Sequence, residues 1–334
     1  MRHRRLPLAF TLVAASLVIA APLLRAQATG SPAPLDAATI DRWMTELSNW
    51  KRWGERDQRG TVNLMTPETR KAAVALVKEG VSVSLSRDAD PVKAPDNGNP
   101  LGLEMLESGV SASPLFAVER LSIVFHGTAY THMDSLAHMF YKGRTYNGYE
   151  QSQIDGTGAG TLDIRAFKGG FVGRGVLMDI PRLKNLPYLE PGTAITPADL
   201  DAWEKQANVK VGAGDMVFFR TGRWTRRATS GPWAIDDESA GLHPTVAQWL
   251  KKRDVAVVGW DGHGEVFPSV VKDVPFPMHQ LLIVAMGTPI FDNCDLEAIS
   301  EAAAQRKRWA FLVTASPLAV PRGTGSPLNP IATF

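Results

Sequence analysis

LSIVFHGTAYTHMDSLAH, residues 121–138, is the stretch around which the chain is organised: it holds three of the seven histidines and an aspartate. It opens with an apolar, β-branched run, which is typical of a strand. If that strand continues through the motif, His126, His132 and Asp134 share one face, because side chains alternate with a period of two. We therefore predict that His132 and Asp134 project together, as two ligands of one metal ion must.

His138 lies four residues beyond Asp134, too far along a straight strand to join that group. The chain must therefore turn after Met133 or Asp134, with Ser135 and Leu136 in the turn. Imidazole and carboxylate ligands suit zinc, manganese or iron, and spare coordination positions leave room for an activated water. Taken singly, these residues have ordinary interpretations, as a buried histidine, a helix cap and a surface histidine. Together they favour a metal site.

The first 28 residues, MRHRRLPLAFTLVAASLVIAAPLLRAQA, combine a basic start, an apolar run and an Ala-x-Ala ending. This pattern predicts a signal peptide cleaved after Ala28, and hence a periplasmic or secreted protein. The alternative is an uncleaved membrane anchor, although two prolines in the run argue against a spanning helix. Paired arginines near the start leave both the general secretory and the twin-arginine route open. Residues 29–35 are expected to form a linker.

Residues 36–334 are long enough for one large domain with its own core, and we expect a single domain there. The chain has one cysteine, Cys294, so an intramolecular disulfide is excluded. The formal net charge is +2 and no long basic run follows the leader, which argues against nucleic-acid binding. We predict a small-molecule substrate, and no membrane association after the leader is removed.

Strand and helix patterns alternate in the second half of the chain. The strand patterns are GRGVLMDI, DMVFFRT, DVAVVGWD and WAFLVTAS, and the helix patterns are ITPADLDAWEKQA and HPTVAQWLKKR. Two more segments, HQLLIVAMG and DLEAISEAAAQR, are apolar or helical in pattern. The alternation predicts an α/β or mixed α+β domain around one sheet or barrel. Further helices are predicted from Asp36 to Leu47 and from Pro67 to Gly80, the second capped by Thr66.

Two segments before the motif, residues 88–100 and 103–114, are long for plain connections. They are expected to form a lid or an oligomer contact, or else a solvated loop.

Several other residues are candidates for binding the substrate. Aromatic residues would line a pocket for a flat or apolar molecule, although they are equally suited to a core. Polar residues at strand ends lie where α/β proteins place their chemistry. The candidates are Trp50, Trp53, Asn63, Tyr146, Asp261 and His263.

Taken together, these motifs resemble the cyclase family of metal-dependent hydrolases, which includes bacterial kynurenine formamidase and isatin hydrolase. THMDSLAH is similar to the family signature Thr-His-x-Asp-x-x-x-His. NWKRWGERDQRGTVNLMTPE, FYKGRTYNG, GRGVLMDIPR, GDMVFFRTG and DNCDLEAI resemble motifs of its longer-chain branch, in the same order. The resemblance covers nearly all of the chain after the leader.

This resemblance implies a swivelling β/β/α fold and hydrolysis of a non-peptide C–N bond in a formamide or cyclic amide. His132 and Asp134 would be metal ligands, and His138 would act as general acid and base. His279 matches a later metal-binding histidine, and Asp292 lies near the position of a metal-binding glutamate. The resemblance also implies a homodimer or a higher homo-oligomer.

The chain departs from the formamidase pattern at two positions. Thr128 stands where those enzymes have a further histidine, and His126 could substitute only if the backbone shifts. Asp292 is one methylene shorter than the glutamate it replaces. We therefore expect one firmly bound zinc or manganese, with a second weak or absent.

Other functions remain open from the sequence. A metal-dependent esterase or lactonase would use the same activated water. A binding protein for a small ligand would have a closed site filled by four protein ligands, because catalytic metals keep an open position. A catalytically silent member of the family is the third alternative.

Overall fold

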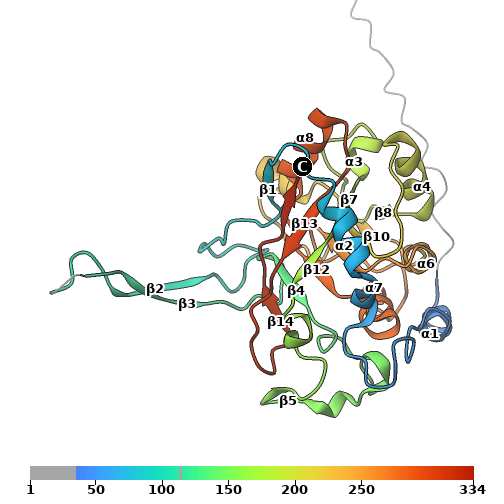
Figure 1. The fold of residues 1–334 in the computed structure, drawn as a ribbon, viewed down its shortest axis with the longest axis horizontal. Coiled ribbons are helices and arrows are strands. Elements are labelled where there is room, and N and C mark those ends of the chain that lie inside the picture. The colour runs from blue at the N-terminus through green and yellow to red at the C-terminus, as the bar shows by residue number, and fades with distance from the viewer. Residues whose placement is uncertain (1–34, 113–114) are drawn as a thin grey trace, which may run out of the picture. The chain divides into compact units, whose positions relative to one another are not determined.

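The computed structural model describes residues 35–112 and 115–334, so the predicted signal peptide and residues 29–34 of the predicted linker lie outside the described residues. The described chain is built around a curled nine-stranded sheet in the order β1-β15-β13-β7-β9-β11-β12-β4-β14 (Figure 1). In that order the strands are β1 (Ser82–Ser84), β15 (Ile331–Thr333), β13 (Ala310–Ala315), β7 (Phe171–Asp179), β9 (Met216–Arg220), β11 (Val257–Trp260), β12 (Ile290–Asp292), β4 (His132–Asp134) and β14 (Gly325–Pro327).

The middle of the sheet is parallel and its flanks are antiparallel. Strands β7, β9, β11 and β12 pair in parallel, whereas β13, β15 and β1 on one side and β4 and β14 on the other pair antiparallel. Every residue of β9 and β11 is buried, as expected for strands covered on both faces. The predicted mixed α/β fold is confirmed.

Helices follow most of the strands, and three two-stranded ribbons lie outside the sheet. The helices are α1 (Ala37–Glu46), α2 (Pro67–Val74), α3 (Ile180–Leu183), α4 (Pro197–Gln206), α5 (Arg223–Ser230), α6 (Val246–Lys252), α7 (Pro277–His279), the π-helix η5 (Gln280–Met286) and α8 (Glu297–Arg306), with 3₁₀ turns η1 (Gly60–Leu64), η2 (Tyr146–Gly148), η3 (Gln151–Gln153) and η4 (Ile164–Phe167). The ribbons are β2 (Gly102–Glu107) with β3 (Val118–Ser122), β5 (Ile154–Asp155) with β6 (Gly158–Ala159), and β8 (Ala194–Ile195) with β10 (Gly241–Leu242). None of the described helices is both long and apolar enough to cross a membrane.

The predicted N-terminal caps are present, but one predicted helix end is wrong. The side chains of Asp36 and Thr66 accept hydrogen bonds from the first turns of α1 and α2. Helix α2 ends at Val74 rather than at Gly80. Gly80 has a φ of +72° and its N–H donates to the carbonyl of Phe334, so it ends a separate turn that holds the C-terminus.

The strand that opens the motif does not continue through it, so the condition under which His126 and Asp134 would share one strand face is not met. Strand β3 ends at Ser122, β4 begins at His132, and residues 123–131 are irregular. The buried Arg223 donates to the carbonyl of Thr128 and to the side chain of Asn293, whose amide donates to the carbonyl of Gly127 at 2.6 Å. These bonds satisfy backbone carbonyls that a neighbouring strand would otherwise have to pair.

Candidate metal centre

The sheet register brings the predicted ligands together. Strand β12 runs antiparallel to β4, with Asp292 directly opposite His132. His279 comes from the last residue of α7, where the chain continues into the π-helix η5, a rare element often found at functional sites. Asp134 lies at the centre of the group: its Oδ1 is 3.4 Å from His132 Nε2 and its Oδ2 is 3.8 Å from His279 Nε2.

Asp292 reaches the same centre despite its short side chain. Its Oδ2 lies 3.7 Å from His132 Nε2 and 3.6 Å from His279 Nε2. Its other oxygen accepts a hydrogen bond from the indole of Trp260. The pairing of β12 with β4 places Asp292 directly opposite His132, so the aspartate reaches the centre without the extra methylene of a glutamate.

His126 belongs to the centre because the backbone before β4 leaves the strand. Its Nδ1 lies 2.9 Å from Asp134 Oδ1, and its Nε2 is 3.1 Å from the hydroxyl of Thr324. The sequence comparison required a backbone shift before His126 could take the place of the histidine missing at position 128. The structure has this shift. Thr128 uses its hydroxyl to bond the carbonyl of Asp96, at the outer part of the irregular segment.

The carboxylate of Asp134 is completely buried and lacks hydrogen-bond donors. Within residues 35–112 and 115–334 neither of its oxygens accepts a hydrogen bond, and the approach of His126 Nδ1 lacks hydrogen-bond geometry. Burial alone would raise the pKa of Asp134, but His138, His126 and His132 hold it well below its usual range. A buried carboxylate that is charged and unbonded is costly unless a cation completes it, so the donor set fits a metal ion.

Two overlapping groups of ligands share Asp134. One is His126, His132 and Asp134, and the other is Asp134, His279 and Asp292; within each group the ligand atoms lie within 4.8 Å of one another. Imidazole and carboxylate donors of this kind suit zinc or manganese. Each group offers three protein ligands, and the two groups have Asp134 in common. The expectation of one firmly bound ion, with a second weak or absent, stays a prediction.

His138 lies beside the ligands rather than among them. The chain turns after β4 as predicted, and the His138 amide donates to the carbonyl of Ser135. The His138 ring stacks on that of His126 with the centroids 4.0 Å apart, and its Nε2 is 3.7 Å from Asp134 Oδ2. Burial lowers the pKa of His138 to about 4, an effect that the neighbouring histidines increase and Asp134 opposes. The neutral ring can accept a proton, as a general base must.

Groups behind the ligands fix the orientation of two imidazoles. His132 Nδ1 bonds the carbonyl of Tyr130 at 2.8 Å, which leaves Nε2 facing Asp134. His279 Nδ1 lies 3.1 Å from Glu265 Oε1, and Glu265 also accepts the backbone N–H of His279 at 2.9 Å. Glu265 was not among the residues predicted from the sequence. It lies in the segment WDGHGE, two residues after His263, and this position alone does not distinguish it from a surface carboxylate.

We expect Glu265→Gln to weaken metal binding by about 10- to 100-fold, because a carboxylate behind a ligating histidine fixes its ring and increases its basicity. Titration of the metal-free variant with zinc, followed by calorimetry, measures the effect. Glu238→Gln, an exposed substitution on the neighbouring loop, is the control. Unchanged affinity in Glu265→Gln would show that His279 needs no such support.

The close approach of β14 to His126 depends on Gly325. A Cβ at this position would lie 2.4 Å from the carbonyl oxygen of Met133 and 2.6 Å from His126 Cε1. We expect Gly325→Ala to displace His126, to destabilise the fold by about 1–3 kcal/mol, and to lower metal content.

Gly127→Ala is the matched control, since a Cβ there meets nothing within 4 Å. Thermal unfolding and elemental analysis of both variants test the prediction. Wild-type metal content in Gly325→Ala would mean that His126 is dispensable.

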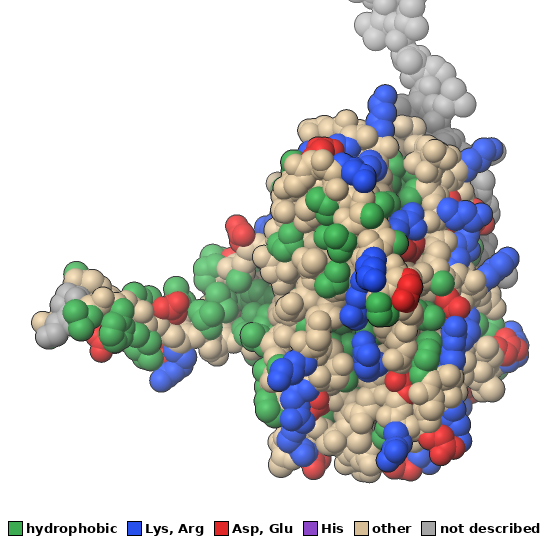
Figure 2. All heavy atoms as spheres, viewed as in Figure 1, with side chains coloured by type: hydrophobic (Ala, Val, Ile, Leu, Met, Phe, Trp, Pro, Cys, Tyr) green, Lys and Arg blue, Asp and Glu red, His purple; other side chains and the backbone are tan. Residues whose placement is uncertain are grey.

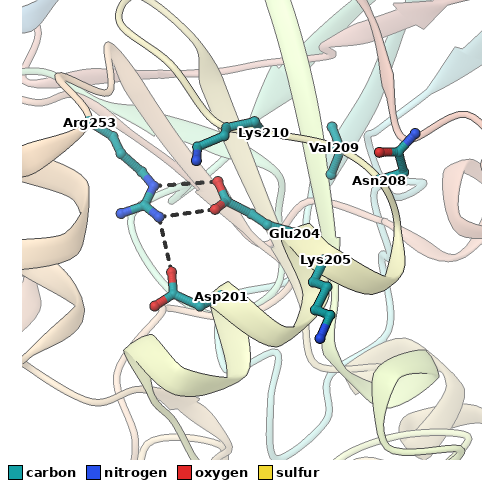
Figure 3. Close-up of a pocket in the computed structure, with 7 residues that line it drawn as sticks. All are labelled: Asp201, Glu204, Lys205, Asn208, Val209, Lys210 and Arg253. Atoms are coloured by element: carbon teal, nitrogen blue, oxygen red, sulfur yellow. Dashed lines mark hydrogen bonds and ion pairs between the residues drawn. The ribbon is translucent and has the colours of Figure 1, made fainter.

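The centre forms the floor of a cavity of about 250 Å³. The cavity is lined by His126, Gly127, Thr128, His132, His138, Met139, Asp236, His263, Phe276, His279 and Asp292. A larger hollow of about 480 Å³ lies elsewhere, between α4 and Arg253 (Figure 3). There Arg253 is already paired with Glu204 and Asp201, each at 3.0 Å. Of these two hollows, the smaller one combines apolar side chains with the metal-binding group.

Among the predicted substrate-binding residues, His263 lines the cavity and the other five do not. Trp50 donates to the carbonyl of Val284, Trp53 stacks on Arg52, and Asn63 bonds Asp57. Tyr146 is buried with its hydroxyl also on Asp57. Asp261 accepts the backbone N–H groups of residues 221–223 and so caps the start of α5. These five residues hold loops and helix ends, a role that their residue types did not distinguish from ligand binding.

The fold is a mixed α/β domain, and a buried group of histidines and carboxylates lies at one flank of its sheet. These two features are those of an α/β protein that binds a metal ion. The model of the Cyclase family matches residues 67–264, which is more than half of the chain. A crystal structure described as that of a novel cyclase is 31% identical, with a TM-score of 0.76, over 86% of this chain and 99% of that one. The chain therefore belongs to the Cyclase family.

Two further relatives are isatin hydrolases. The enzyme from Roseibium aggregatum is 28% identical over 152 residues, which are 43% of this chain and 53% of that protein, so the match spans about half of the relative's length. A crystal structure of an isatin hydrolase bound to the product analogue thioisatinate is 20% identical, with a TM-score of 0.54, over 80% of this chain and 98% of that one. This second likeness shows the shared fold.

Proposed function

We propose that this protein is a metal-dependent hydrolase that cleaves a non-peptide C–N bond in a small formamide or cyclic amide. The observation that carries the proposal is the buried Asp134 carboxylate, unbonded and surrounded by histidines at the floor of a cavity. Membership of the Cyclase family and the match to an isatin hydrolase support the same reaction class.

Zinc or manganese would be held by Asp134 together with His132 and His126, by Asp134 together with His279 and Asp292, or in both positions. A bound divalent ion supplies Lewis acidity, which lowers the pKa of water and polarises a substrate carbonyl. Trp260 and Glu265 hold Asp292 and His279 in place from outside the cavity.

His138 is the group that would move the proton. It lines the cavity with its ring about 29% exposed, whereas His132 and His279 are almost completely enclosed. In its neutral form it takes a proton from the attacking water and returns it to the leaving nitrogen. The neighbouring imidazoles hold the pKa of Asp134 below its usual range, which favours the ionised carboxylate that a metal ligand needs.

The apolar part of the cavity lining favours a small apolar substrate. Phe276 and Met139 line the cavity, and the ring of Phe276 packs against His263 and His279. Burial lowers the pKa of His263, which favours its uncharged form. A cavity of about 250 Å³ is smaller than the usual pocket of a drug-sized ligand, so it suits a small molecule. An esterase or lactonase would use the same groups, and substrate panels separate these reactions.

The test is metal-dependent turnover by the protein without its leader. Protein stripped with a chelator and reloaded with zinc or manganese is assayed against formamides, lactams and lactones. We expect no turnover in the stripped protein and recovery on reloading, with amides preferred. If the protein hydrolyses lactones alone, the proposed amide substrate is wrong and the protein is a lactonase. If the metal-loaded protein hydrolyses none of the compounds, the result favours a binding protein.

We also propose that the leader is removed after Ala28 and that the protein is exported. The basic start, apolar run and Ala-x-Ala ending support this. N-terminal sequencing of protein from a fractionated host should give a mature chain beginning at Thr29 in the exported fraction. An intact leader in the membrane fraction would show an anchor instead.

A further inference from the structure

Arg223, the first residue of α5, is buried beside the segment that carries His126. It is 3% exposed, whereas many lysines and arginines lie at the surface on the face drawn in Figure 2. Burial lowers the pKa of Arg223 to about 10, an effect that Asp96 and Asp261 oppose. A buried guanidinium costs desolvation free energy, and replacing a buried ion pair by apolar residues often stabilises a protein. A contribution to stability therefore does not by itself account for an arginine at this position.

The segment beside Arg223 depends on side chains for its hydrogen bonds. Within the described part of the chain, the backbone groups of residues 124–130 make no hydrogen bond to other backbone groups. Arg223 donates instead to the carbonyl of Thr128. The side-chain amide of Asn293 donates to the carbonyl of Gly127 at 2.6 Å. These two bonds therefore fix the path of the segment.

Both donors are themselves held in place by the ends of the central strands. Asn293 follows the predicted ligand Asp292 at the end of β12, and its N–H donates to the carbonyl of Gly262 at 2.8 Å. The N–H of Arg223 donates to the carboxylate of Asp261 at 3.2 Å. The guanidinium of Arg223 also donates to the side-chain oxygen of Asn293. The two donors are thus joined to each other and, through Asn293, to a second ligand-bearing strand.

Asp96 balances the charge of the buried guanidinium. It is 2% exposed, and its Oδ2 lies 3.5 Å from Arg223 Nη2. Arg227, one turn further along α5, donates to the same carboxylate at 2.7 and 3.2 Å. Within the described residues, none of the hydrogen bonds of Arg227 reaches residues 124–130. The two arginines therefore share Asp96 but differ in their contact with the segment.

We propose that Arg223 is a positioning residue of the metal centre, which acts with Asn293 to hold His126 in reach of the ion. This role rests on the metal centre of the proposed function and does not depend on which bond the protein cleaves. His126 Nδ1 lies 2.9 Å from Asp134 Oδ1, in one of the two ligand groups. Without the bonds to the carbonyls that follow it, the backbone at His126 would be free to move away, and that group would lose one of its three ligands.

Titration of the metal-free mature protein with zinc tests this role. Arg223→Lys keeps the charge beside Asp96 but loses the planar fork that reaches several acceptors at once. We expect this variant to bind zinc about 10- to 100-fold more weakly than the wild type, the usual loss when a group that orients a ligand is removed. Arg227→Lys is the matched control, and it should bind zinc as the wild type does.

A double-variant cycle distinguishes positioning from a general loss of stability. If Arg223 acts through His126, then Arg223→Lys has no further effect once His126 is absent. We therefore expect His126→Ala/Arg223→Lys to bind zinc as weakly as His126→Ala alone. Cobalt-loaded protein gives a second readout, because its visible spectrum depends on the number and geometry of the ligands. The spectrum of Arg223→Lys should resemble that of His126→Ala rather than that of the wild type.

Asn293→Gly makes the same test if Arg223→Lys does not fold. Asn293 has a φ of +52°, which glycine adopts freely, so this variant removes the side-chain amide without straining the backbone. We expect the same loss of zinc affinity, and no further loss when His126→Ala is combined with it.

Three results would overturn the proposal. One is wild-type zinc affinity in Arg223→Lys or, where that variant does not fold, in Asn293→Gly. Another is an effect that adds in full to that of His126→Ala, since the residue would then act by another route. The third is an equal loss of affinity in Arg227→Lys, which would assign the effect to the ion pair with Asp96. A wild type that binds no metal would overturn this role and the proposed function together.

Discussion

His138→Ala is expected to lower turnover by about 100- to 10,000-fold while leaving metal content unchanged, because loss of a general acid and base costs about that much. The His138 ring lines the cavity, 3.7 Å from Asp134, but it belongs to neither ligand group. The measurement is steady-state hydrolysis of the best substrate of the panel, with elemental analysis of the same preparation.

His138→Gln is a second variant for the same role, since its amide fills part of the space of the ring but does not accept a proton near neutral pH. We expect it to be as inactive as His138→Ala and to bind metal normally. If both variants lost metal to the same degree as His132→Ala, His138 would be a ligand, and the separation of ligands from proton carrier would be wrong.

Asp134→Asn is expected to abolish metal binding, because both ligand groups contain this residue. Wild-type protein should be stabilised by metal by about 2.7 kcal/mol when free metal is at 100 times its dissociation constant. The variant should gain nothing. Thermal unfolding with and without zinc or manganese measures the metal-induced shift in unfolding temperature for the wild type and for Asp134→Asn.

Asp236→Asn is the control for Asp134→Asn. Asp236 lines the same cavity, but its side chain is 69% exposed and belongs to neither ligand group. Its variant should show the wild-type metal-induced shift. An equal shift in Asp134→Asn would place the ion elsewhere and remove the basis of the proposed mechanism.

Much of the fold could be predicted because its strands and helices differ sharply in pattern. The buried parallel strands β9 and β11 are short apolar runs, and α4 begins with a capping box made by Thr196 and Asp199. Each of these signals lies within a few consecutive residues, so it can be read from the sequence without knowing the rest of the fold. The π-helix η5 lacks a comparable signal, because an apolar run such as QLLIVAM is compatible with several buried conformations.

The path of the motif could not be predicted from the motif itself, because the residues that determine it lie far away in the chain. Arg223 and Asn293 satisfy the carbonyls of residues 127–128 and allow the segment to leave the sheet. Nothing in residues 121–134 indicates that such partners exist. The same departure brings His126 to Asp134 and so adds a histidine to the metal-binding group.

The site residues also fall into two groups: those whose position follows from local pattern, and those whose position depends on distant parts of the chain. His132 and Asp134 lie two residues apart on one strand, so their convergence follows from strand geometry alone. Asp292 and His279 converge on them through strand pairing and a helix start, and the family resemblance rather than local pattern suggested those two. Glu265 was missed because a buried carboxylate behind a histidine has no spacing rule.

The most direct test of the metal centre is elemental analysis of the purified mature protein beside His132→Ala and Asp236→Asn. We predict one to two equivalents of zinc or manganese in the wild type and in Asp236→Asn, and a marked loss in His132→Ala. A wild type that binds no metal even after reloading, or a His132→Ala variant with full metal content, would contradict the account.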